Sequence, residues 1–177
     1  MNSIIVKNKF LSLNQYLREI GQLPDEAVLF GVCEDNLPYL LNVNDDTAPH
    51  TAIENGRPVL NTIRGYVYGR DQSYVTIDIV DTSKGSTNLF LSALVEWTRV
   101  RGKKNKVILL VRDLETVEIS RDFLWLLENG TKHGVYIVAS FQKDVEVLEK
   151  FRLVIRQDGD GFVAPEGLDH TVRFFAL

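Results

Sequence analysis

The sequence contains a single cysteine, Cys33, and has no long hydrophobic run. One cysteine cannot form a disulfide within the chain, and a thiolate metal cluster needs several. Because no run approaches the ~20 apolar residues of a membrane-spanning helix, we expect no transmembrane segment. At the N-terminus, lysines adjoin the apolar residues 4–6 and no small-residue cleavage site follows, which argues against a secretory signal. These absences predict a cytoplasmic protein.

A strong excess of one charge is also missing. The chain has 20 lysines and arginines against 24 acidic residues, a net charge of -4. This balance argues against a protein that binds nucleic acid mainly by electrostatics, although it does not exclude a local basic patch. The three histidines, His50, His133 and His170, lie far apart without an HxxxH or Cys/His spacing, so we predict no metal site. A GxSxG motif is absent as well, and no Ser/His/Asp arrangement can be recognised.

The most informative segment that is present is a buried strand near the middle of the chain. Residues 107–111 are five apolar residues in succession, and Arg112 and Asp113 follow directly. A strand with one wet face alternates in polarity, whereas an unbroken branched run is typical of a parallel strand covered on both faces by helices. Ligands in such sheets bind at the carboxyl ends of the strands, where Arg112 and Asp113 lie.

Elsewhere the apolar patterns alternate between strands and helices. Ser12 with Gln15 predicts the start of a helix of about ten residues, and Asn55-Gly56 followed by Pro58 predicts a second helix. Further helices are expected after Thr87, at 116–128 and at 144–150, and strands at 27–32, 38–43, 50–53, 73–80, 135–139, 153–155, 162–164 and 172–175. Short loops between alternating strands and helices predict right-handed crossovers and an α/β fold.

We predict a single domain over residues 1–177, which at this length would bury about 70% of the surface of the unfolded chain. A small N-terminal helix and β-hairpin form an entry at 1–47, and the α/β core follows at 48–157. A C-terminal β extension occupies 158–177, where the last two strands are expected to pair as a hairpin around the turn at 158–161.

Several short motifs can be compared with a known family. They are GVCED at 31–35 with PYLLN at 38–42, PHTAI at 49–53, DIVDTSKG at 78–85, VILLVRD at 107–113, and GVYIVASFQ at 134–142. In this order they resemble the strand pair, first and second core strands, Walker B strand and sensor strand of FtsK/SpoIIIE/HerA-type translocation ATPases. The resemblance covers residues 27–157. It implies a P-loop NTPase-like three-layer sandwich with a mainly parallel central sheet.

The family resemblance also implies a strand order. The core strands would lie side by side in the order fifth, first, fourth, third and second along the chain. An unrelated α/β protein with similar strands would show a different order. Family members commonly form ring oligomers, which the resemblance suggests for this chain.

The phosphate loop departs from the family pattern. A GxxxxGK[ST] loop uses glycines so that consecutive amides face the phosphates, a lysine to neutralise them and a hydroxyl to bind magnesium. Here only Glu54 and Asn55 separate the first core strand from Gly56, so the loop is several residues too short. Arg57 stands in the lysine position, and Pro58 stands in the hydroxyl position and has no amide hydrogen. Glu54 would place a carboxylate near the phosphates.

The Walker B strand departs in a similar way. Arg112 occupies the position of the metal-holding aspartate, which leaves Asp113 as the only acid of the pair. A cation there would repel magnesium, and nucleotide hydrolysis needs both the phosphate loop and the metal site. Arg112 and Asp113 could form a functional pair or a salt bridge that replaces the lost metal, and we favour the salt bridge. Gln142 stands at the sensor position.

Two further candidate sites carry positive charge. Lys84, Gly85, Ser86 and Thr87 follow a strand and precede a helix, as in an anion site, but Ser86 or Thr87 could equally be an ordinary N-cap with Lys84 in solvent. We favour the N-cap because the GKST order is absent. A basic loop could contact a nucleic-acid backbone, but without interleaved aromatics we favour a solvated turn. Its members are Arg99, Arg101, Lys103, Lys104 and Lys106.

Together these features predict a non-hydrolysing protein of the FtsK/HerA-like fold that acts as a binding, scaffolding or regulatory module without a cofactor. The expected partner is a protein, either an active ATPase of the same fold or a second copy of the chain. DNA is a weaker candidate, and no membrane contact is expected. The alternative is an NTPase linked to DNA or protein translocation that uses ATP with magnesium. Arg57 or Lys84 would then bind the phosphates and Asp113 would be the acid.

Overall fold

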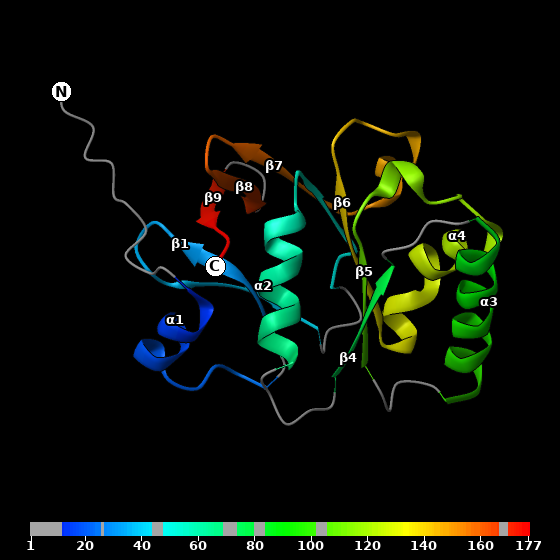
Figure 1. Cartoon of the computed structure of the whole chain (residues 1–177), viewed down its shortest axis with the longest axis horizontal. Helices are drawn as coiled ribbons and strands as arrows, with labels where there is room; N and C mark the ends of the chain where they lie inside the picture. The colour runs from blue at the N-terminus through cyan, green and yellow to red at the C-terminus, as the bar shows by residue number, and fades with distance from the viewer. Residues whose placement is uncertain are drawn as a thin grey trace.

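The structure, a computed structural model, describes residues 12–25, 27–43, 48–68, 74–79, 84–101, 106–166 and 170–177. Its helices are α1 (Leu13–Ile20), α2 (Arg57–Tyr68), α3 (Lys84–Arg101) and α4 (Arg121–Asn129), with 3₁₀ segments η2 (Leu114–Thr116), η3 (Gly130–His133) and η4 (Glu146–Lys150). Its strands are β1 (Ala27–Cys33), β2 (Pro38–Asn42), β3 (Thr51–Glu54), β4 (Tyr74–Ile79), β5 (Lys106–Val111), β6 (Val135–Phe141), β7 (Leu153–Asp158), β8 (Gly161–Glu166) and β9 (His170–Phe175). Figure 1 shows α1 near one end of the molecule and α3 with α4 at the other.

The nine described strands form one sheet in the order β2-β1-β9-β8-β7-β3-β6-β5-β4. Neighbours from β7 to β4 are parallel, and neighbours from β2 to β7 are antiparallel. The prediction of a mainly parallel sheet is therefore wrong for the sheet as a whole, which is mixed. The reason is that β8 and β9 join the N-terminal hairpin to the edge of β7. Within the parallel part, the order β7-β3-β6-β5-β4 is the fifth-first-fourth-third-second order that the resemblance implies.

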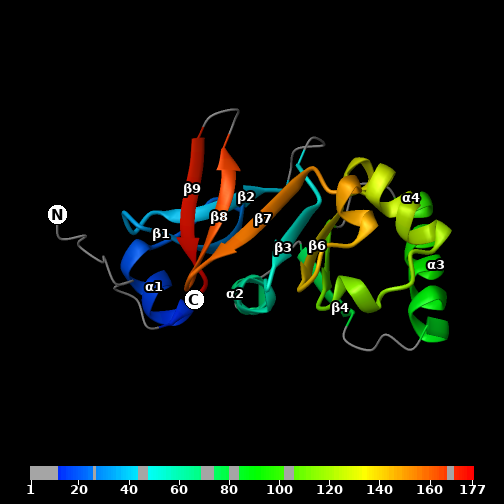
Figure 2. The ribbon, with the colours of Figure 1, turned by 90° about the horizontal axis from the view of Figure 1, so that it is seen from above.

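The central strand β5 is buried on both faces, as its apolar run predicts. Val107, Leu109 and Val111 belong to a core formed with α3 and α4. The alternate residues Ile108 and Leu110 belong to a second core formed with α1 and α2. Successive side chains of a strand point to opposite faces, so one strand contributes to both cores. The parallel strands therefore lie between two helical layers, with α2 on one side and α3 and α4 on the other (Figure 2).

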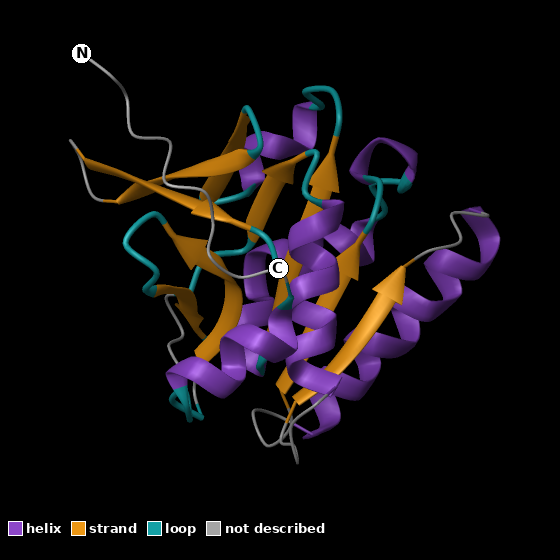
Figure 3. Cartoon of the chain, turned by 60° about the vertical axis from the view of Figure 1, so that its left-hand side comes forward, coloured by secondary structure: helices purple, strands orange, loops and turns teal. Residues whose placement is uncertain are grey.

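The antiparallel strands bend around α2. Phe30 of β1 and Phe174 of β9 are fully buried in the same core as Ile63 of α2. The view in Figure 2 looks nearly along α2 and shows strands on several sides of it. Figure 3 shows antiparallel strands extending to one side of the molecule, away from much of the helical structure. The last residue adds to this packing, because the backbone N–H of Leu177 donates to Thr62 Oγ1 of α2 at 2.9 Å.

Helix α1 is confirmed at its predicted start, but two other helix boundaries differ from prediction. Ser12 caps α1, and its Oγ accepts from the amide of Gln15 at 3.3 Å. Helix α3 begins at Lys84, so the segment predicted as a loop up to Thr87 is its first turn. Helix α4 begins at Arg121 rather than 116, because Ser120 Oγ accepts from the amide of Phe123 at 3.2 Å and caps it there. The helix predicted at 144–150 is the 3₁₀ segment η4.

The turn at 158–161 connects β7 to β8 rather than β8 to β9. The last two strands do pair with each other, but not around this turn, so that detail of the predicted C-terminal hairpin is wrong. Gly159 takes a positive φ of 61°, which allows the tight β7–β8 connection. Among the residues that the structure describes, no helix is long and apolar enough to cross a bilayer.

Candidate functional site

The connection between β3 and α2 is the position of a phosphate loop, and it consists of only Asn55 and Gly56. The amide of Asn55 donates to the Phe141 carbonyl at 2.7 Å, and the amide of Gly56 donates to the Ile53 carbonyl at 3.2 Å. A Cβ on Gly56 would lie 2.5 Å from the Cβ of Ile53, so only glycine fits this close turn. Both amides already donate to protein carbonyls, and Pro58 has no amide hydrogen. The turn therefore lacks the row of free N–H donors that binds a phosphate.

The side chain of Arg57, at the start of α2, reaches across to the loop that follows β5. Its Nη2 lies 2.6 Å from Oδ1 and 2.7 Å from Oδ2 of Asp113. This hydrogen bond, together with the negative charge of Asp113, raises the pKa of Arg57 above its ordinary value. The side chains are 55% and 30% exposed, so the pair is open to solvent on one side. Exposed ion pairs of this kind contribute little to the free energy of unfolding. This pair is of interest because it joins the start of α2 to the loop after β5.

The ion pair corrects the prediction for Asp113. We expected a salt bridge that replaces the lost metal, with Arg112 as the partner. The partner of Asp113 is instead Arg57, 56 positions earlier in the chain. Arg112 lies in a bend directly after β5, and Asp113 follows it with extended backbone angles. Arg112 is half-buried and has contacts of its own.

A cavity of about 370 Å³ opens beside this ion pair and is called the α2–β5 cavity below. Its lining includes Arg57, Asp113 and Gln142, three of the predicted site residues. Of these, Arg57 directly follows Gly56 in the sequence. Glu115, Thr116 and Lys143 complete the lining and were not found by the sequence analysis. The signal for Glu115 was a second acid two residues after Asp113, and Lys143 directly follows the predicted sensor position. The lining holds two cations, Arg57 and Lys143, and two anions, Asp113 and Glu115.

Glu115 occupies the amides that end β6. Its Oε1 accepts hydrogen bonds from the backbone N–H groups of Gln142 and Lys143, the latter at 2.8 Å. These amides directly follow the carboxyl end of the parallel strand β6, where an anionic ligand would be expected to bind. A carboxylate of the protein itself fills that role here.

Glu54 does not lie where the sequence analysis placed its carboxylate. Its Oε2 accepts from the amide of Gln157 in β7 at 3.3 Å. The neighbouring Asn55 Nδ2 donates to Gln157 Oε1 at 2.7 Å. Both side chains therefore tie the β3–α2 turn to β7, on the side opposite to β6 in the sheet order.

The predicted anion site at Lys84, Gly85, Ser86 and Thr87 is the first turn of α3. The expectation that Ser86 or Thr87 caps this helix is wrong, because both lie inside it. The side chain of Thr87 is 5% exposed and has contacts of its own, so it does not face a ligand. The side chains of residues 84–86 and the whole of 80–83 fall outside the described residues.

The predicted basic loop is divided among three segments. Arg99 and Arg101 end α3, Lys106 begins β5, and Lys103 and Lys104 fall outside the described residues. The guanidinium of Arg99 pairs with Glu96 at 3.1 Å and lies 4.8 Å from the centroid of a Trp125 ring. Arg99 of α3 therefore contacts α4 through Trp125, while half of its side chain remains exposed.

His50 is a buried histidine at the start of β3. Its Nδ1 accepts from the amide of Ile137 in β6 at 3.0 Å. Burial lowers the pKa of His50 to about 4, and the Leu126 carbonyl partly offsets this shift. The neutral ring thus joins β3 to β6. Across the ranges that the structure describes, no group of three or more potential metal ligands comes together.

No family model matches the sequence, and no curated protein is significantly similar to it. Solved structures are similar. The cytoplasmic domain of the type VII secretion ATPase EccC from Thermomonospora curvata has a TM-score of 0.64 at 14% identity, over 88% of this chain and 27% of that chain. The cytoplasmic domain of EssC has a TM-score of 0.65 at 11% identity, over 94% and 46%. ATPases 2 and 3 of T. curvata EccC, in complex with a signal sequence peptide, give 0.57 at 16% identity, over 88% and 42%.

These similarities show that the chain shares the fold of the ATPase domains of EccC and EssC. The chain spans less than half of the length of each of the three structures. Identities of 11–16% concern the fold and not the activity.

Proposed function

We propose that this chain is a P-loop ATPase-fold protein that does not hydrolyse nucleotide and acts as a binding, scaffolding or regulatory module. The observation that carries this proposal is the ion pair of Arg57 with Asp113, at 2.6 and 2.7 Å. It joins the residue at the phosphate-binding lysine position to the acid at the end of the Walker B-like strand.

The chemistry of phosphoryl transfer explains why this pair matters. A P-loop NTPase binds the β- and γ-phosphates with its loop amides and lysine, and holds magnesium with a hydroxyl and the Walker B aspartate. In this chain the cation and the acid neutralise each other. A nucleotide that took Arg57 from Asp113 would bring its phosphates close to a carboxylate without the hydroxyl ligand that Pro58 replaces. Repulsion between the phosphates and Asp113 would oppose binding.

The backbone donors around the α2–β5 cavity support the same proposal. The amides of Asn55 and Gly56 bind carbonyls, and those of Gln142 and Lys143 bind Glu115. A phosphate would have to displace these hydrogen bonds before it gained its own. Preorganised free donors are the main way in which such sites stabilise phosphate charge, so their absence weakens both binding and catalysis.

The comparison structures support a protein as the partner. ATPases 2 and 3 of EccC are solved in complex with a signal sequence peptide. We therefore place an active ATPase of this fold, or a second copy of the chain, before DNA as the partner.

Calorimetric titration of the intact protein with ATP, with and without magnesium, tests whether the protein binds nucleotide. We expect no binding heat at millimolar nucleotide. The matched variants are Arg57→Ala and Lys84→Ala, with Arg64→Ala, an exposed arginine two turns further along α2, as the control. Micromolar, magnesium-dependent binding that is lost in Arg57→Ala or Lys84→Ala but kept in Arg64→Ala would favour an NTPase with a non-standard phosphate loop.

Sedimentation velocity over a hundredfold range of protein concentration tests association with a second copy. A concentration-dependent larger species supports self-association. A single monomeric species at all concentrations leaves a different ATPase-fold protein as the partner to be mixed in.

A further inference from the structure

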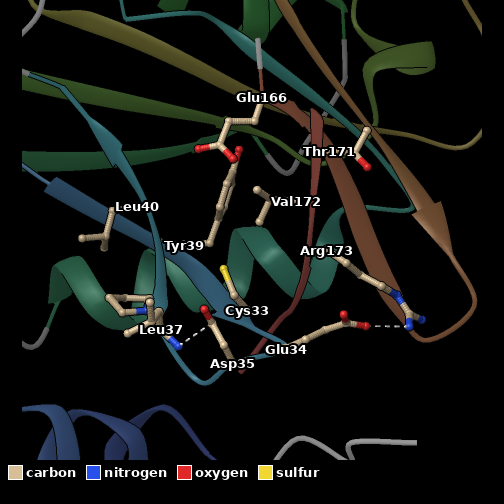
Figure 4. Close-up of a pocket in the computed structure, with 11 residues that line it drawn as sticks. Cys33, Glu34, Asp35, Leu37, Tyr39, Leu40, Glu166, Thr171, Val172 and Arg173 are labelled. Carbon is tan, nitrogen blue, oxygen red and sulfur yellow. Dashed lines mark hydrogen bonds and ion pairs between the residues drawn. The ribbon is translucent and has the colours of Figure 1, made fainter. Parts of the chain in front are cut away.

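A second hollow lies at the antiparallel end of the sheet, between the β1–β2 hairpin and the strands β8 and β9 (Figure 4). Its volume is about 610 Å³, and it is called the hairpin groove below. Side chains of the hairpin line one wall, and residues of β8 and β9 line the other. They are Cys33, Glu34, Asp35, Leu37, Pro38, Tyr39 and Leu40 on the hairpin, and Glu166, Thr171, Val172 and Arg173 on β8 and β9.

One edge of β9 is open along the hairpin groove. Strand β1 pairs with β9 at two positions, and the second of these is Cys33 with Phe174. Strand β9 begins at His170, so residues 170–173 continue beyond this pair. Among the described strands, β8 alone pairs with residues 170–173. An open strand edge can accept an extended segment as an additional strand.

The backbone groups of Thr171 face this open side. A Cβ on Gly31 of β1 would lie 2.2 Å from the Phe175 carbonyl, which therefore faces β1. Backbone groups of alternate residues face the same side of a strand, so those of Arg173 and Thr171 face this side as well. On the other side Thr171 is opposite Pro165 of β8, which has no N–H to donate. Thr171 therefore offers its amide and carbonyl to a strand that lies in the groove.

The charge of the hairpin groove is negative. Glu34, Asp35 and Glu166 contribute carboxylates, and Arg173 contributes a cation. Arg173 is already engaged, because its Nη1 donates to Glu34 at 3.2 Å. Asp35 Oδ1 accepts from the neutral amide of Leu37 at 3.0 Å. In the part of the chain that the structure describes, neither Asp35 nor Glu166 forms an ion pair with a cation.

An apolar surface separates the two unpaired carboxylates. Figure 4 shows Tyr39 and Val172 between Glu166 at one end of the groove and Asp35 at the other. The ring of Tyr39 stacks on Phe174, with centroids 4.4 Å apart. Burial is the main cause that raises the pKa of Tyr39 to about 12, so the ring stays neutral. The groove therefore presents negative, apolar and negative surface in succession.

The pairing of the strands sets the spacing of an occupant. Glu166 is opposite His170, and Cys33 is opposite Phe174, so these two ends of the edge are four residues apart on β9. Four extended residues span about 13 Å, and residues i, i+2 and i+4 of a strand share one face. Basic side chains at i and i+4 of an added strand would therefore lie near Glu166 and Asp35, with an apolar side chain between them.

We propose that the hairpin groove binds an extended segment of a partner protein as a strand added to the open edge of β9. The segment carries basic side chains at i and i+4 and an apolar side chain at i+2. Its backbone pairs with Thr171, its basic groups pair with Glu166 and Asp35, and its apolar side chain packs against Tyr39. The inference rests on the groove alone and does not depend on whether nucleotide binds at the α2–β5 cavity.

Fluorescence anisotropy with the full chain and a synthetic peptide tests the proposed chemistry. The probe is the peptide TKTVTKT, labelled with fluorescein at its N-terminus and amidated at its C-terminus, and the matched control is TETVTET. We expect saturable binding of TKTVTKT below millimolar concentration at low salt, which weakens as salt is added. We expect no binding of TETVTET, because its carboxylates would meet those of the groove.

Removal of the groove charges tests the ion pairs. Asp35→Asn with Glu166→Gln keeps the size of both side chains and should weaken binding of TKTVTKT about tenfold, since two exposed ion pairs are lost. The control variant, Glu128→Gln with Glu149→Gln, removes the same charge from exposed positions on α4 and η4 and should bind as the unaltered protein does. Circular dichroism confirms that both variants are folded.

Cys33 reports whether the peptide lies in the groove. It is the single cysteine of the chain, is half-buried and belongs to the groove lining. Saturating TKTVTKT should slow the reaction of Cys33 with a maleimide several-fold, whereas TETVTET should leave the rate unchanged. This measurement uses the unaltered protein, so it decides the question even if the groove variant does not fold.

N-methylation of the peptide tests whether it adds as a strand. In an added strand the amides of every second residue face β9, and the remaining amides face away. Methyl groups on one alternate set of amides should therefore abolish binding, whereas methyl groups on the other set should largely preserve it. Both methylated peptides keep the two lysines, so a difference between them reports the backbone contacts.

Four results would overturn the inference. They are no saturable binding of TKTVTKT at millimolar concentration, equal binding of TETVTET, a groove variant that binds as tightly as the control variant, and equal effects of the two methylated sets. A groove occupied by a second copy of the chain would give a different result. Peptide binding would then be lost as a larger species forms in sedimentation velocity at rising protein concentration, and this result would also overturn the inference.

Discussion

The α2–β5 cavity and the hairpin groove are both lined by charged side chains, but they differ in how the charges are balanced. In the cavity, Arg57 pairs with Asp113, and Glu115 binds two backbone amides. In the groove, Asp35 and Glu166 form no ion pair with a described cation, and a strand edge is open. These charged groups of the cavity are thus paired within the protein, whereas two carboxylates of the groove are not paired with a described cation.

This difference concerns two surfaces that one fold carries at opposite ends of its sheet. The parallel strands and their strand order place Arg57 and Asp113 opposite each other, as in a phosphate site. The side chains at those positions then decide whether the site takes a ligand or closes on itself. The antiparallel strands provide the second surface.

The largest expected effect comes from the core that supports the cavity. Leu110 of β5 is 1% exposed in the core beside α2. We expect Leu110→Ala to lower the free energy of unfolding by about 2–5 kcal/mol, through lost burial and the cavity that remains. The matched control Leu89→Ala, at a side chain 76% exposed on α3, should change it by less than ~0.5 kcal/mol. Urea denaturation measures both, and equal effects would contradict the burial of β5 on both faces.

The second effect is a pH dependence of the free energy of unfolding, which arises from His50 beside the parallel strand β3. The pKa of His50 is lowered to about 4 in the folded state, from 6.5 in the unfolded chain. The unfolded state therefore binds more protons between these values, and stability is full above pH 6.5 and falls as the pH drops toward 4. The total loss should be about 3 kcal/mol. His50→Gln should remove this slope in urea denaturation, whereas His170→Gln at the exposed start of β9 should keep it.

The third effect concerns the contact between β1 and β9, which joins the hairpin to the rest of the sheet. A Cβ on Gly31 of β1 would lie 2.2 Å from the Phe175 carbonyl of β9. We expect Gly31→Ala to lower stability by about 1–3 kcal/mol, because the strands must move apart. It should also speed the reaction of Cys33, at the β1–β9 pairing, with a maleimide. A variant with unchanged stability and unchanged Cys33 reactivity would contradict the β1–β9 contact that links the hairpin to the sheet.

The smallest effect concerns the charges beside the groove. Asp160 is 86% exposed and pairs with Arg173 at 3.2 Å. Asp160→Asn should therefore lower the free energy of unfolding by no more than about 1 kcal/mol, and less at high salt. Thermal unfolding at low and high salt measures the change. A large loss would mean that the ion pairs of Arg173 hold the antiparallel end together, and not the stacking of Tyr39 on Phe174.

Much of the parallel core could be predicted because its signals are local. The apolar run of β5 indicated burial on both faces, and the short motifs indicated the strand order. The antiparallel half could not be predicted in full, since the pairing of β1 with β9 joins residues more than 140 positions apart. The start of α4 was missed because the cap at Ser120 competes with an apolar pattern that begins earlier.

Three residues of the cavity lining were named from the sequence, but the contacts among the lining residues were not. Arg57, Asp113 and Gln142 come together as the motifs suggested. The partner of Asp113 was misassigned because adjacency in sequence favoured Arg112, whereas the observed partner, Arg57, lies 56 positions earlier in the chain. Glu115 was missed because its role is to bind the amides of Gln142 and Lys143, a contact that no sequence spacing reveals.

The central claim is that the Arg57–Asp113 pair replaces a working phosphate and magnesium site. A turnover assay of the intact protein at millimolar ATP and magnesium tests it most directly, with Asp113→Asn as the matched variant. The account predicts phosphate release no faster than the buffer blank, and no difference between the protein and the variant. Turnover by the protein that disappears in Asp113→Asn would contradict the account and identify Asp113 as the acid of an active NTPase.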